Sequence, residues 1–257
     1  MYAEERRAKI LKWLDQRGTV NSTDLAHELK TSRETVRRDI IELSKQGLLV
    51  KTHGGAITTG NGDVLLELPF SLRETRSTEE KKRMCAFAAT LLHEADTIFI
   101  DNSTSCSYLV RYIPKSMRLT ILTNSLRILL DSMKYNVGNW NVLCTGGKLM
   151  DKTMSLNNYV AVNTLAQFNP NKAFMSCHCI SPQLKVLDHY IDDIEIKRQV
   201  LKNAKRSFLL ADHTKANNTG VVEIADISAF QHVITDTKMD AAIIRDIRSR
   251  EIFIDPV

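Results

Sequence analysis

The stretch SRETVRRDIIEL, residues 32–43, decides the fold of the N-terminal part of this chain. At 100° per residue it places Val36, Ile40 and Leu43 in one narrow arc. The stretch therefore predicts a helix that buries this face against a core. Ser32 is a favourable N-cap, and we expect the helix to run to about Lys45.

Two further helical patterns precede this stretch. Glu4 to Arg17 has apolar residues three and four apart and is followed by Gly18, and Thr23 to Lys30 follows Ser22, a second good N-cap. The tight turn before Ser32 gives helix-turn-helix spacing. Two short strands, Leu48 to Val50 and Ala56 to Ile57, enclose the segment 51–55, so the pattern predicts a winged helix-turn-helix.

The outward side of the third helix carries residues suited to DNA. Arginine binds guanine or phosphate through two parallel hydrogen bonds, and threonine contacts bases or backbone. Residues 1–57 hold eleven Lys or Arg against eight Asp or Glu, a surplus of three. We therefore expect double-stranded operator DNA as a partner, with contacts from the third helix and from the tip of the hairpin: Ser32, Arg33, Thr35, Arg37, Arg38, Lys51 and His53.

The order of these residues resembles a known family. The string Ser32-Arg33-Glu34-Thr35-Val36-Arg37-Arg38-Asp39-Ile40, followed by Gly47-Leu48-Leu49 and His53-Gly54-Gly55-Ala56, is similar to the N-terminal signature of the DeoR family of bacterial transcriptional regulators. The similarity spans about residues 3 to 58.

The rest of the chain alternates short apolar runs with amphipathic helices. Residues 1–57 form the DNA-binding domain in this interpretation, 58–77 a linker, and 78–257 a sensor and oligomerisation domain. Short strands separated by helices predict an α/β fold of Rossmann type, with a mostly parallel sheet covered on both faces. The strands are expected at 97–100, 119–122, 142–144, 172–180, 207–211, 232–235 and 252–254, with helices at 79–92, 108–112, 125–135, 159–168 and 193–203.

Polar loops follow four of these strands. Parallel sheets bind ligands at the carboxyl ends of their strands, and hydroxyls with backbone amides at a helix start form a phosphate cradle. Any one such loop is usually only an N-cap or a turn. Four at one sheet edge predict a small-molecule site, and they are 101–105, 123–125, 145–148 and 212–215.

The family resemblance continues over about residues 78 to 236. Asp101-Asn102-Ser103-Thr104-Ser105 is similar to the family's Asp-x-Gly-Thr-Thr loop, and Thr123-Asn124-Ser125, Gly146-Gly147, Glu195-Ile196-Lys197-Arg198 and Ala211-Asp212-x-x-Lys215 resemble further motifs. The resemblance implies an effector domain related to sugar-phosphate isomerases that responds to a phosphorylated sugar. In this interpretation Ser103, Thr104 and Ser105 hold the phosphate, and Lys215 is its counter-charge. Gly146 and Gly147 belong to the effector site, while Asn124, Asp212 and Glu195 bind sugar hydroxyls or tether the site.

Composition excludes several other classes of protein. The chain has 257 residues, 43% apolar and 25% charged, which is ordinary for a globular protein and too long for a disulfide-stapled miniprotein. Its longest apolar runs fall far short of the ~18 residues that suggest a bilayer span, and no secretory signal is visible, so we expect a cytoplasmic protein that does not enter membranes. Five cysteines among apolar neighbours predict buried reduced thiols, and we expect no metal and no cofactor.

Two functions compete. The first is a transcriptional regulator that represses a carbohydrate-utilisation operon, is relieved by a sugar phosphate, and binds repeated half-sites as a homo-oligomer. The alternative is a sugar-phosphate isomerase or deaminase with an appended helical domain, for which Asp101, Asp212, His213 and Glu195 are acid or base candidates. An isomerase has no use for a winged helix, so we expect a regulator without catalytic residues.

Overall fold

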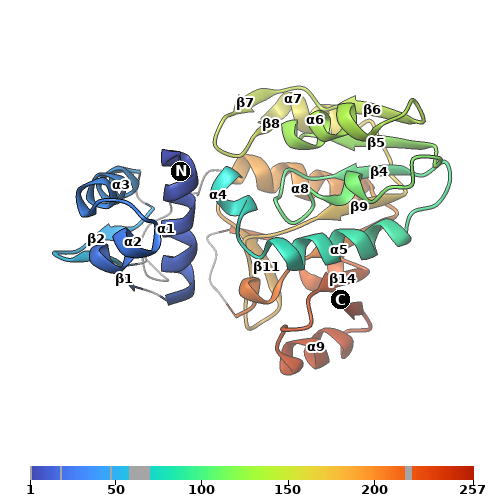
Figure 1. Ribbon diagram of the computed structural model, residues 1–257. Helices are drawn as coiled ribbons and strands as arrows, with labels where there is room; N and C mark the ends of the chain where they lie inside the picture. The colour runs from blue at the N-terminus through green and yellow to red at the C-terminus, as the bar shows by residue number, and fades with distance from the viewer. Residues whose placement is uncertain (1, 18, 47, 58–69, 218–221) are drawn as a thin grey trace. The chain divides into compact units, whose positions relative to one another are not determined.

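A computed structural model describes residues 2–17, 19–46, 48–57, 70–217 and 222–257. The chain divides into two compact units, residues 1–76 and 77–257 (Figure 1). The predicted helix ends at Gly18 and Gly47, and residues 58–69 of the predicted linker, lie outside the described residues.

The N-terminal unit is a three-helix module with a small antiparallel sheet in the order β1-β3-β2. Its elements are α1 (Ala3–Arg17), β1 (Thr19–Asn21), α2 (Ser22–Glu28), α3 (Arg33–Lys45), β2 (Val50–Lys51) and β3 (Gly55–Ile57), with α4 (Phe70–Glu74) beyond them. Val36, Ile40 and Leu43 of α3 are buried as predicted, and pack with Ile10 and Leu14 of α1 in one apolar cluster. The predicted winged helix-turn-helix is confirmed.

Two details of this unit differ from the sequence prediction. Asn21 rather than Ser22 caps α2, because its side-chain oxygen accepts a hydrogen bond from the Thr23 amide at 2.7 Å. The strand predicted at 48–50 is reduced to β2, since Leu48 and Leu49 are drawn into the apolar cluster below α3.

The larger unit is built on a sheet of seven parallel strands in the order β15-β14-β12-β9-β4-β5-β6. This confirms the predicted Rossmann-like architecture. The strands are β4 (Thr97–Ile100), β5 (Leu119–Thr123), β6 (Trp140–Cys144), β9 (Lys172–Met175), β12 (Arg206–Leu210), β14 (His232–Thr235) and β15 (Phe253–Pro256).

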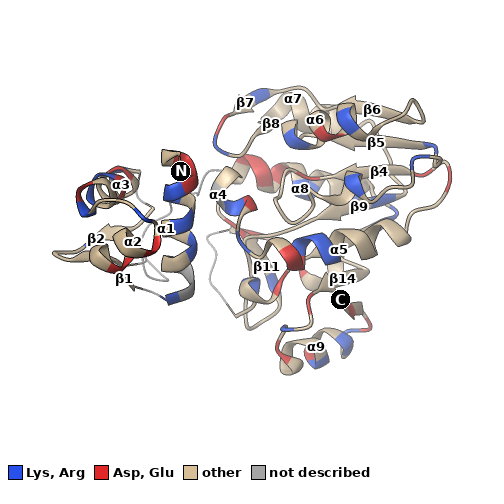
Figure 2. Cartoon of the chain, in the orientation of Figure 1, with Lys and Arg blue, Asp and Glu red and all other residues tan. Residues whose placement is uncertain are grey.

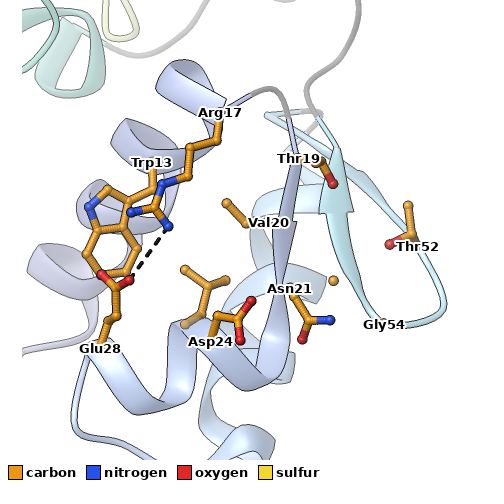
Figure 3. A pocket seen from close by; sticks show the side chains of 11 residues that line it. Trp13, Arg17, Thr19, Val20, Asn21, Asp24, Glu28, Thr52 and Gly54 are labelled. Carbon is orange, nitrogen blue, oxygen red and sulfur yellow. Dashed lines mark ion pairs between the residues drawn. The ribbon is translucent and has the colours of Figure 1, made fainter.

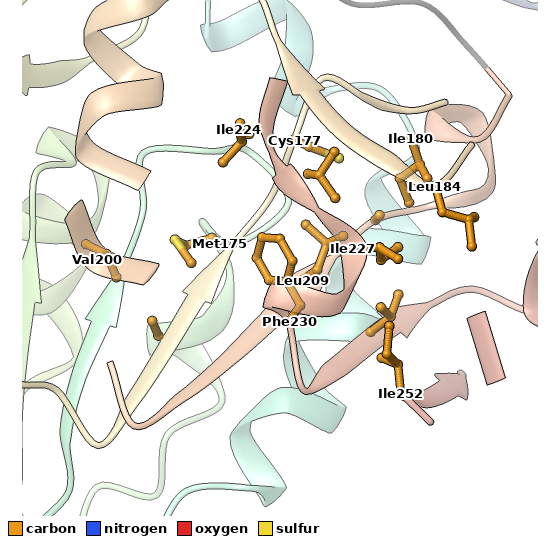
Figure 4. Packing of buried hydrophobic residues seen from close by; sticks show 14 of the residues in the cluster. Met175, Cys177, Ile180, Leu184, Val200, Leu209, Ile224, Ile227, Phe230 and Ile252 are labelled. Carbon is orange, nitrogen blue, oxygen red and sulfur yellow. The ribbon is translucent and has the colours of Figure 1, made fainter. Parts of the chain in front are cut away.

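Successive side chains of each strand point to opposite faces of the sheet, and both faces are buried. Ile98 and Ile100 pack with helix α5 (Thr78–Thr90), with the short 3-10 turn η1 (Leu109–Arg111) and with α6 (Leu126–Tyr135). Phe99 packs on the other face with α7 (Tyr159–Leu165), α8 (Ile191–Asn203) and α9 (Ala241–Arg248). Figure 4 shows part of this second cluster, where Met175 and Leu209 of the sheet meet Phe230.

Smaller elements lie beside the main sheet. β7 (Lys148–Met150) and β8 (Ser155–Asn157) form a hairpin, and a second sheet has the order β10-β11-β13. Its strands are β10 (Cys179–Ile180), β11 (Lys185–Asp188) and β13 (Val222–Asp226), and two further 3-10 turns are η2 (His213–Lys215) and η3 (Ile227–Ala229). The sequence analysis anticipated neither the hairpin nor the second sheet, apart from β10 within the predicted strand 172–180.

That predicted strand is wrong as a single element. The chain leaves the main sheet after Met175, because the Ser176 amide donates to the carboxylate of Asp101 at 2.8 Å and the Ser176 hydroxyl to the Leu210 carbonyl at 2.6 Å. The helix predicted at 108–112 is only the turn η1. No helix in the described part of the chain is long and apolar enough to cross a membrane.

Candidate nucleic-acid and effector sites

Helix α3 carries several basic residues (Figure 2), and those on its outward face are exposed to solvent. The side chains of Arg37 and Arg38 are 64% and 79% exposed and lie only 3.8 and 3.6 Å from Glu34. Such exposed pairs contribute at most about 1 kcal/mol, so both guanidinium groups are available to a phosphate or a base. Arg33 is exposed as well.

Ser32 and Thr35 hold the start of the helix. The Ser32 hydroxyl accepts a hydrogen bond from the Thr35 amide at 3.1 Å, and the two hydroxyls lie 2.8 Å apart. This N-cap fixes the first turn of α3. In the wing, Lys51 and His53 are exposed, so the seven predicted DNA-contacting residues share α3 and the wing of one small unit.

Asp39 is a functional residue that the sequence analysis missed. It lies on the buried side of α3 and accepts hydrogen bonds from the Arg6 and Arg7 guanidinium groups at 2.5 and 3.0 Å. These ion pairs join α1 to the middle of α3 and hold the helix in place. The signal was present, because at 100° per residue Asp39 lies about 40° from Leu43, at the edge of the arc of Val36, Ile40 and Leu43.

A hollow of about 340 Å³ lies in the same unit and is lined by residues of α1, β1, α2 and the wing (Figure 3). Asp24 and Glu28 line it, and Glu28 lies 3.6 Å from Arg17, which stacks over Trp13. No residue of α3 contributes to its lining. The exposed arginines of α3 therefore lie outside this hollow.

In the larger unit the loop 101–105 leaves the carboxyl end of β4, and Asp101 anchors it. The Asp101 carboxylate is fully buried and accepts hydrogen bonds from the Ser103 amide at 3.0 Å and the Ser103 hydroxyl at 2.5 Å. Its other oxygen accepts from the Ser176 amide of the neighbouring strand end. The loop is therefore held rigidly by a buried charge.

Donors on this loop are left without protein acceptors. The Ser105 hydroxyl is buried and has no partner, and the amides of Thr104 and Ser105 bond to no acceptor among the described residues. The Lys81 ammonium, on α5 and only 4% exposed, lies 3.0 Å from the Thr104 hydroxyl. Amides, a hydroxyl and a buried cation form an environment suited to an anion. Lys81 was missed by the sequence analysis because Glu79-Glu80-Lys81-Lys82 is typical of a solvated helix face.

A network of side-chain amide hydrogen bonds begins at the residue that follows β5. The Asn124 side-chain amide donates to Asn157 at 3.0 Å, Asn157 donates to Asp193, and Asn102 lies 3.4 Å from the same carboxylate. The side-chain oxygen of Asn124 is buried and has no hydrogen-bond partner in the part of the chain that the structure describes. Burial raises the pKa of Asp193, an effect that Lys197 only partly offsets. These groups have the donors and acceptors that sugar hydroxyls require.

Lys197 and the nearby buried carboxylates form one cluster with these amides, and the Lys197 ammonium partly neutralises the negative charge of the carboxylates. Its ammonium lies 2.6 Å from Asp188 and 3.9 Å from Asp101, and all three residues are largely buried. Burial by itself lowers the pKa of Lys197, but the charges of Asp188, Asp101 and Asp193 more than reverse this and raise it. Burial likewise tends to raise the pKa of Asp188, yet Lys197 lowers it overall. Lys197 and Asp188 therefore remain an ion pair.

The other predicted effector residues do not all join this cluster. Glu195 is exposed and pairs with Arg198 at 3.0 Å, so it lies outside it. The Lys215 ammonium donates to the Cys177 carbonyl, and Asp212 caps the turn η2 through the Thr214 amide at 3.0 Å.

Gly146 and Gly147 have positive φ values of 68° and 114°. A Cβ on Gly147 would lie 2.4 Å from the Asn157 carbonyl oxygen, so this glycine permits the close approach of its loop to β8.

Each of the two units matches a known protein family domain. Residues 6–60 match the DeoR-like helix-turn-helix domain, and residues 76–237 match the DeoR C terminal sensor domain. The HTH-type transcriptional repressor CsqR of Escherichia coli is 30% identical over 238 residues, 93% of this chain and 89% of that protein. The lactose phosphotransferase system repressor of Staphylococcus aureus is 27% identical (92% and 93%), and the glycerol-3-phosphate regulon repressor of E. coli is 24% identical (99% and 99%).

Proposed function

This chain belongs to the DeoR family of DNA-binding transcriptional regulators, and we propose that it represses a carbohydrate-utilisation operon until a phosphorylated sugar binds its sensor unit. The names of the lactose phosphotransferase system repressor and the glycerol-3-phosphate regulon repressor support a carbohydrate-related role. We place its action in the cytoplasm, where bacterial operator DNA lies.

The DNA-binding half of the proposal rests on α3. Its exposed Arg33, Arg37 and Arg38 face away from the core that Val36 and Ile40 enter. In a winged helix-turn-helix such a helix enters the major groove, and the wing contacts the adjacent backbone. Lys51 and His53 are the wing residues of this interface.

The effector half rests on one observation, the group of donors around the 101–105 loop. The buried Ser105 hydroxyl and the Thr104 and Ser105 amides have no acceptor among the described residues, and the Lys81 ammonium lies beside them, 3.0 Å from the Thr104 hydroxyl. Such groups donate hydrogen bonds to a phosphate monoester. We assign the counter-charge to Lys81, whose ammonium lies 3.0 Å from the Thr104 hydroxyl of this loop, in preference to Lys215, whose ammonium contacts the Cys177 carbonyl instead. Asn124, Asn157 and Asp193 then receive the sugar hydroxyls.

The regulator is expected to act as a homo-oligomer. One small winged unit buries too little surface for a tight and specific site, so two or more units on repeated half-sites are needed. A monomer that footprints one isolated half-site tightly would contradict this expectation.

The test uses the full chain and an operator selected from random DNA. Fluorescence anisotropy at fixed salt follows release of that operator while phosphorylated sugars and the same sugars without phosphate are added. We expect release by one or a few of the phosphorylated compounds only. Release by none of them, or equally by the unphosphorylated sugars, would refute the effector assignment.

Variants of the proposed phosphate-binding residues test where the effector binds. Lys81→Met and Ser105→Ala each remove a hydrogen bond to a charged group, worth about 1.5–3 kcal/mol, and should raise the effector concentration for half-release by about 10- to 150-fold. Glu195→Gln lies outside the cluster and is the matched control, expected to respond like the wild type. Turnover of the effector by the wild type would instead favour the isomerase or deaminase alternative.

A further inference from the structure

Asp212, His213 and Asp236 meet at the carboxyl edge of the main sheet, after β12 and β14. Each offers one ligand atom, and these atoms all lie within 4.8 Å of one another. The His213 Nδ1 atom is 3.0 Å from both oxygens of Asp236. Both aspartates are buried, whereas His213 is partly exposed.

The carboxylates are held in place by backbone amides. Asp236 accepts from the His213 amide at 2.7 Å and from the Lys238 amide at 2.8 Å, and Asp212 accepts from the Thr214 amide. Hydrogen bonds of this kind orient carboxylates that bind metals.

Positive charge is scarce around this pair of acids. No Lys or Arg nitrogen in the described part of the chain lies within 4.0 Å of the Asp212 or Asp236 carboxylate. The Lys238 ammonium pairs with Glu80 at 2.7 Å, and the Lys215 ammonium donates to a carbonyl. By contrast, the buried carboxylates of Asp39 and Asp131 each pair with two arginines. Within the described part of the chain, the His213 imidazole is the one basic side chain placed within 4.0 Å of either carboxylate. A divalent cation would supply the further positive charge that two buried carboxylates call for.

The spacing suits a small cation. Ligand atoms about 2.1 Å from an octahedral ion are separated by about 3.0 Å when adjacent and about 4.2 Å when opposite. The separation of His213 Nδ1 from the Asp236 oxygens matches adjacent ligands, and Asp212 completes the set from the side. Two carboxylates and one imidazole favour Mn²⁺ or another first-row divalent ion over ions that prefer thiolates.

We propose that Asp212, His213 and Asp236 bind a divalent metal ion, with Asp236 and His213 as adjacent ligands and Asp212 as the third. This set shares no residue with the donors at Lys81 and Ser105. It assigns Asp212 to the metal in place of a sugar hydroxyl.

The test is titration of the full chain with Mn²⁺ alone, followed by the electron paramagnetic resonance signal of the free ion. We expect one ion per chain in the wild type. His213→Ala and Asp212→Asn should each weaken binding at least about tenfold, because each removes one direct ligand. Asn at position 212 can still accept from the Thr214 amide, so this variant keeps the turn while losing the charge.

The matched control is His232→Ala. His232 also contacts a carboxylate, Asp255 at 2.5 Å, but no second acid completes a set there. Its Mn²⁺ affinity should equal that of the wild type. Bound Mn²⁺ should also raise the melting temperature of the wild type and of His232→Ala, but not of Asp212→Asn. Absence of binding by the wild type, or unchanged binding by both site variants, would overturn the proposal.

Discussion

Replacement of Lys197 by methionine tests the electrostatic balance of the sensor unit. The substitution keeps the length and the apolar stem of the side chain but removes the ammonium that lies 2.6 Å from Asp188 and 3.9 Å from Asp101. Breaking a buried ion pair by removing one partner typically costs about 3–5 kcal/mol, because the other charge stays buried and unpaired. For a unit of this size 1 kcal/mol shifts the melting temperature by about 2–4 °C, so we expect a loss of roughly 6–20 °C at pH 7.

The assay is differential scanning calorimetry of the wild type, Lys197→Met and the double variant Lys197→Met with Asp188→Asn. The double variant should recover a large part of the lost stability, since it also removes the unpaired carboxylate of Asp188.

The pH dependence of this stabilisation has a definite sign. The ion pair lowers the pKa of Asp188 in the folded wild type, so its stabilisation is present above the unfolded pKa and is lost as the pH falls through the folded pKa.

Without Lys197, burial raises the pKa of Asp188, and protonation relieves the unpaired charge as the pH falls. The difference between the wild type and Lys197→Met should therefore shrink between pH 7 and about pH 4. A single variant that melts within about 2 °C of the wild type at pH 7, or a difference that grows toward pH 4, would refute the reasoning.

Three further predictions follow from exposed side chains. Arg37→Ala and Arg38→Ala should each weaken operator binding by about 5- to 150-fold at fixed salt while the melting temperature stays unchanged; full affinity in both would exclude α3 as the recognition helix. Lys51→Ala should weaken all DNA sequences alike and reduce the dependence of affinity on salt, as measured by titrations between 50 and 200 mM. In the native protein at pH 8 a thiol reagent should label the exposed Cys144 and spare Cys177, since burial raises the pKa of Cys177 to about 12; mass spectrometry of the labelled peptides decides this.

Local sequence patterns were sufficient to predict the helices and strands that bury one face or both faces. The α3 stripe and the apolar runs of β4 and β14 predicted these elements almost to the residue, because each is set by spacing within a few positions. The prediction failed at 172–180, where the pattern is equally apolar. There the Asp101 carboxylate, 75 residues away in the chain, takes the Ser176 amide and ends the strand.

The functional residues divide in the same way. The exposed DNA-contact candidates were predictable because a helix that buries Val36 and Ile40 must point Arg37 and Arg38 outward. Lys81, by contrast, reads as an ordinary surface lysine, and only the packing of α5 against the sheet brings it to Thr104.

The sequence by itself thus determined the winged helix-turn-helix, the parallel α/β unit and the family, since these depend on periodicity and on motifs with fixed spacing. Tertiary structure alone decided which polar side chains share a site. The parallel crossovers bring the ends of β4, β5, β9, β12 and β14 to one edge of the sheet, and burial there leaves Ser105 and Asn124 each with a side-chain atom that has no partner among the described residues. The tertiary structure also keeps Glu195 exposed and apart from Ser105 and Asn124. Neither result follows from local sequence, because burial and hydrogen bonding depend on residues distant in the chain.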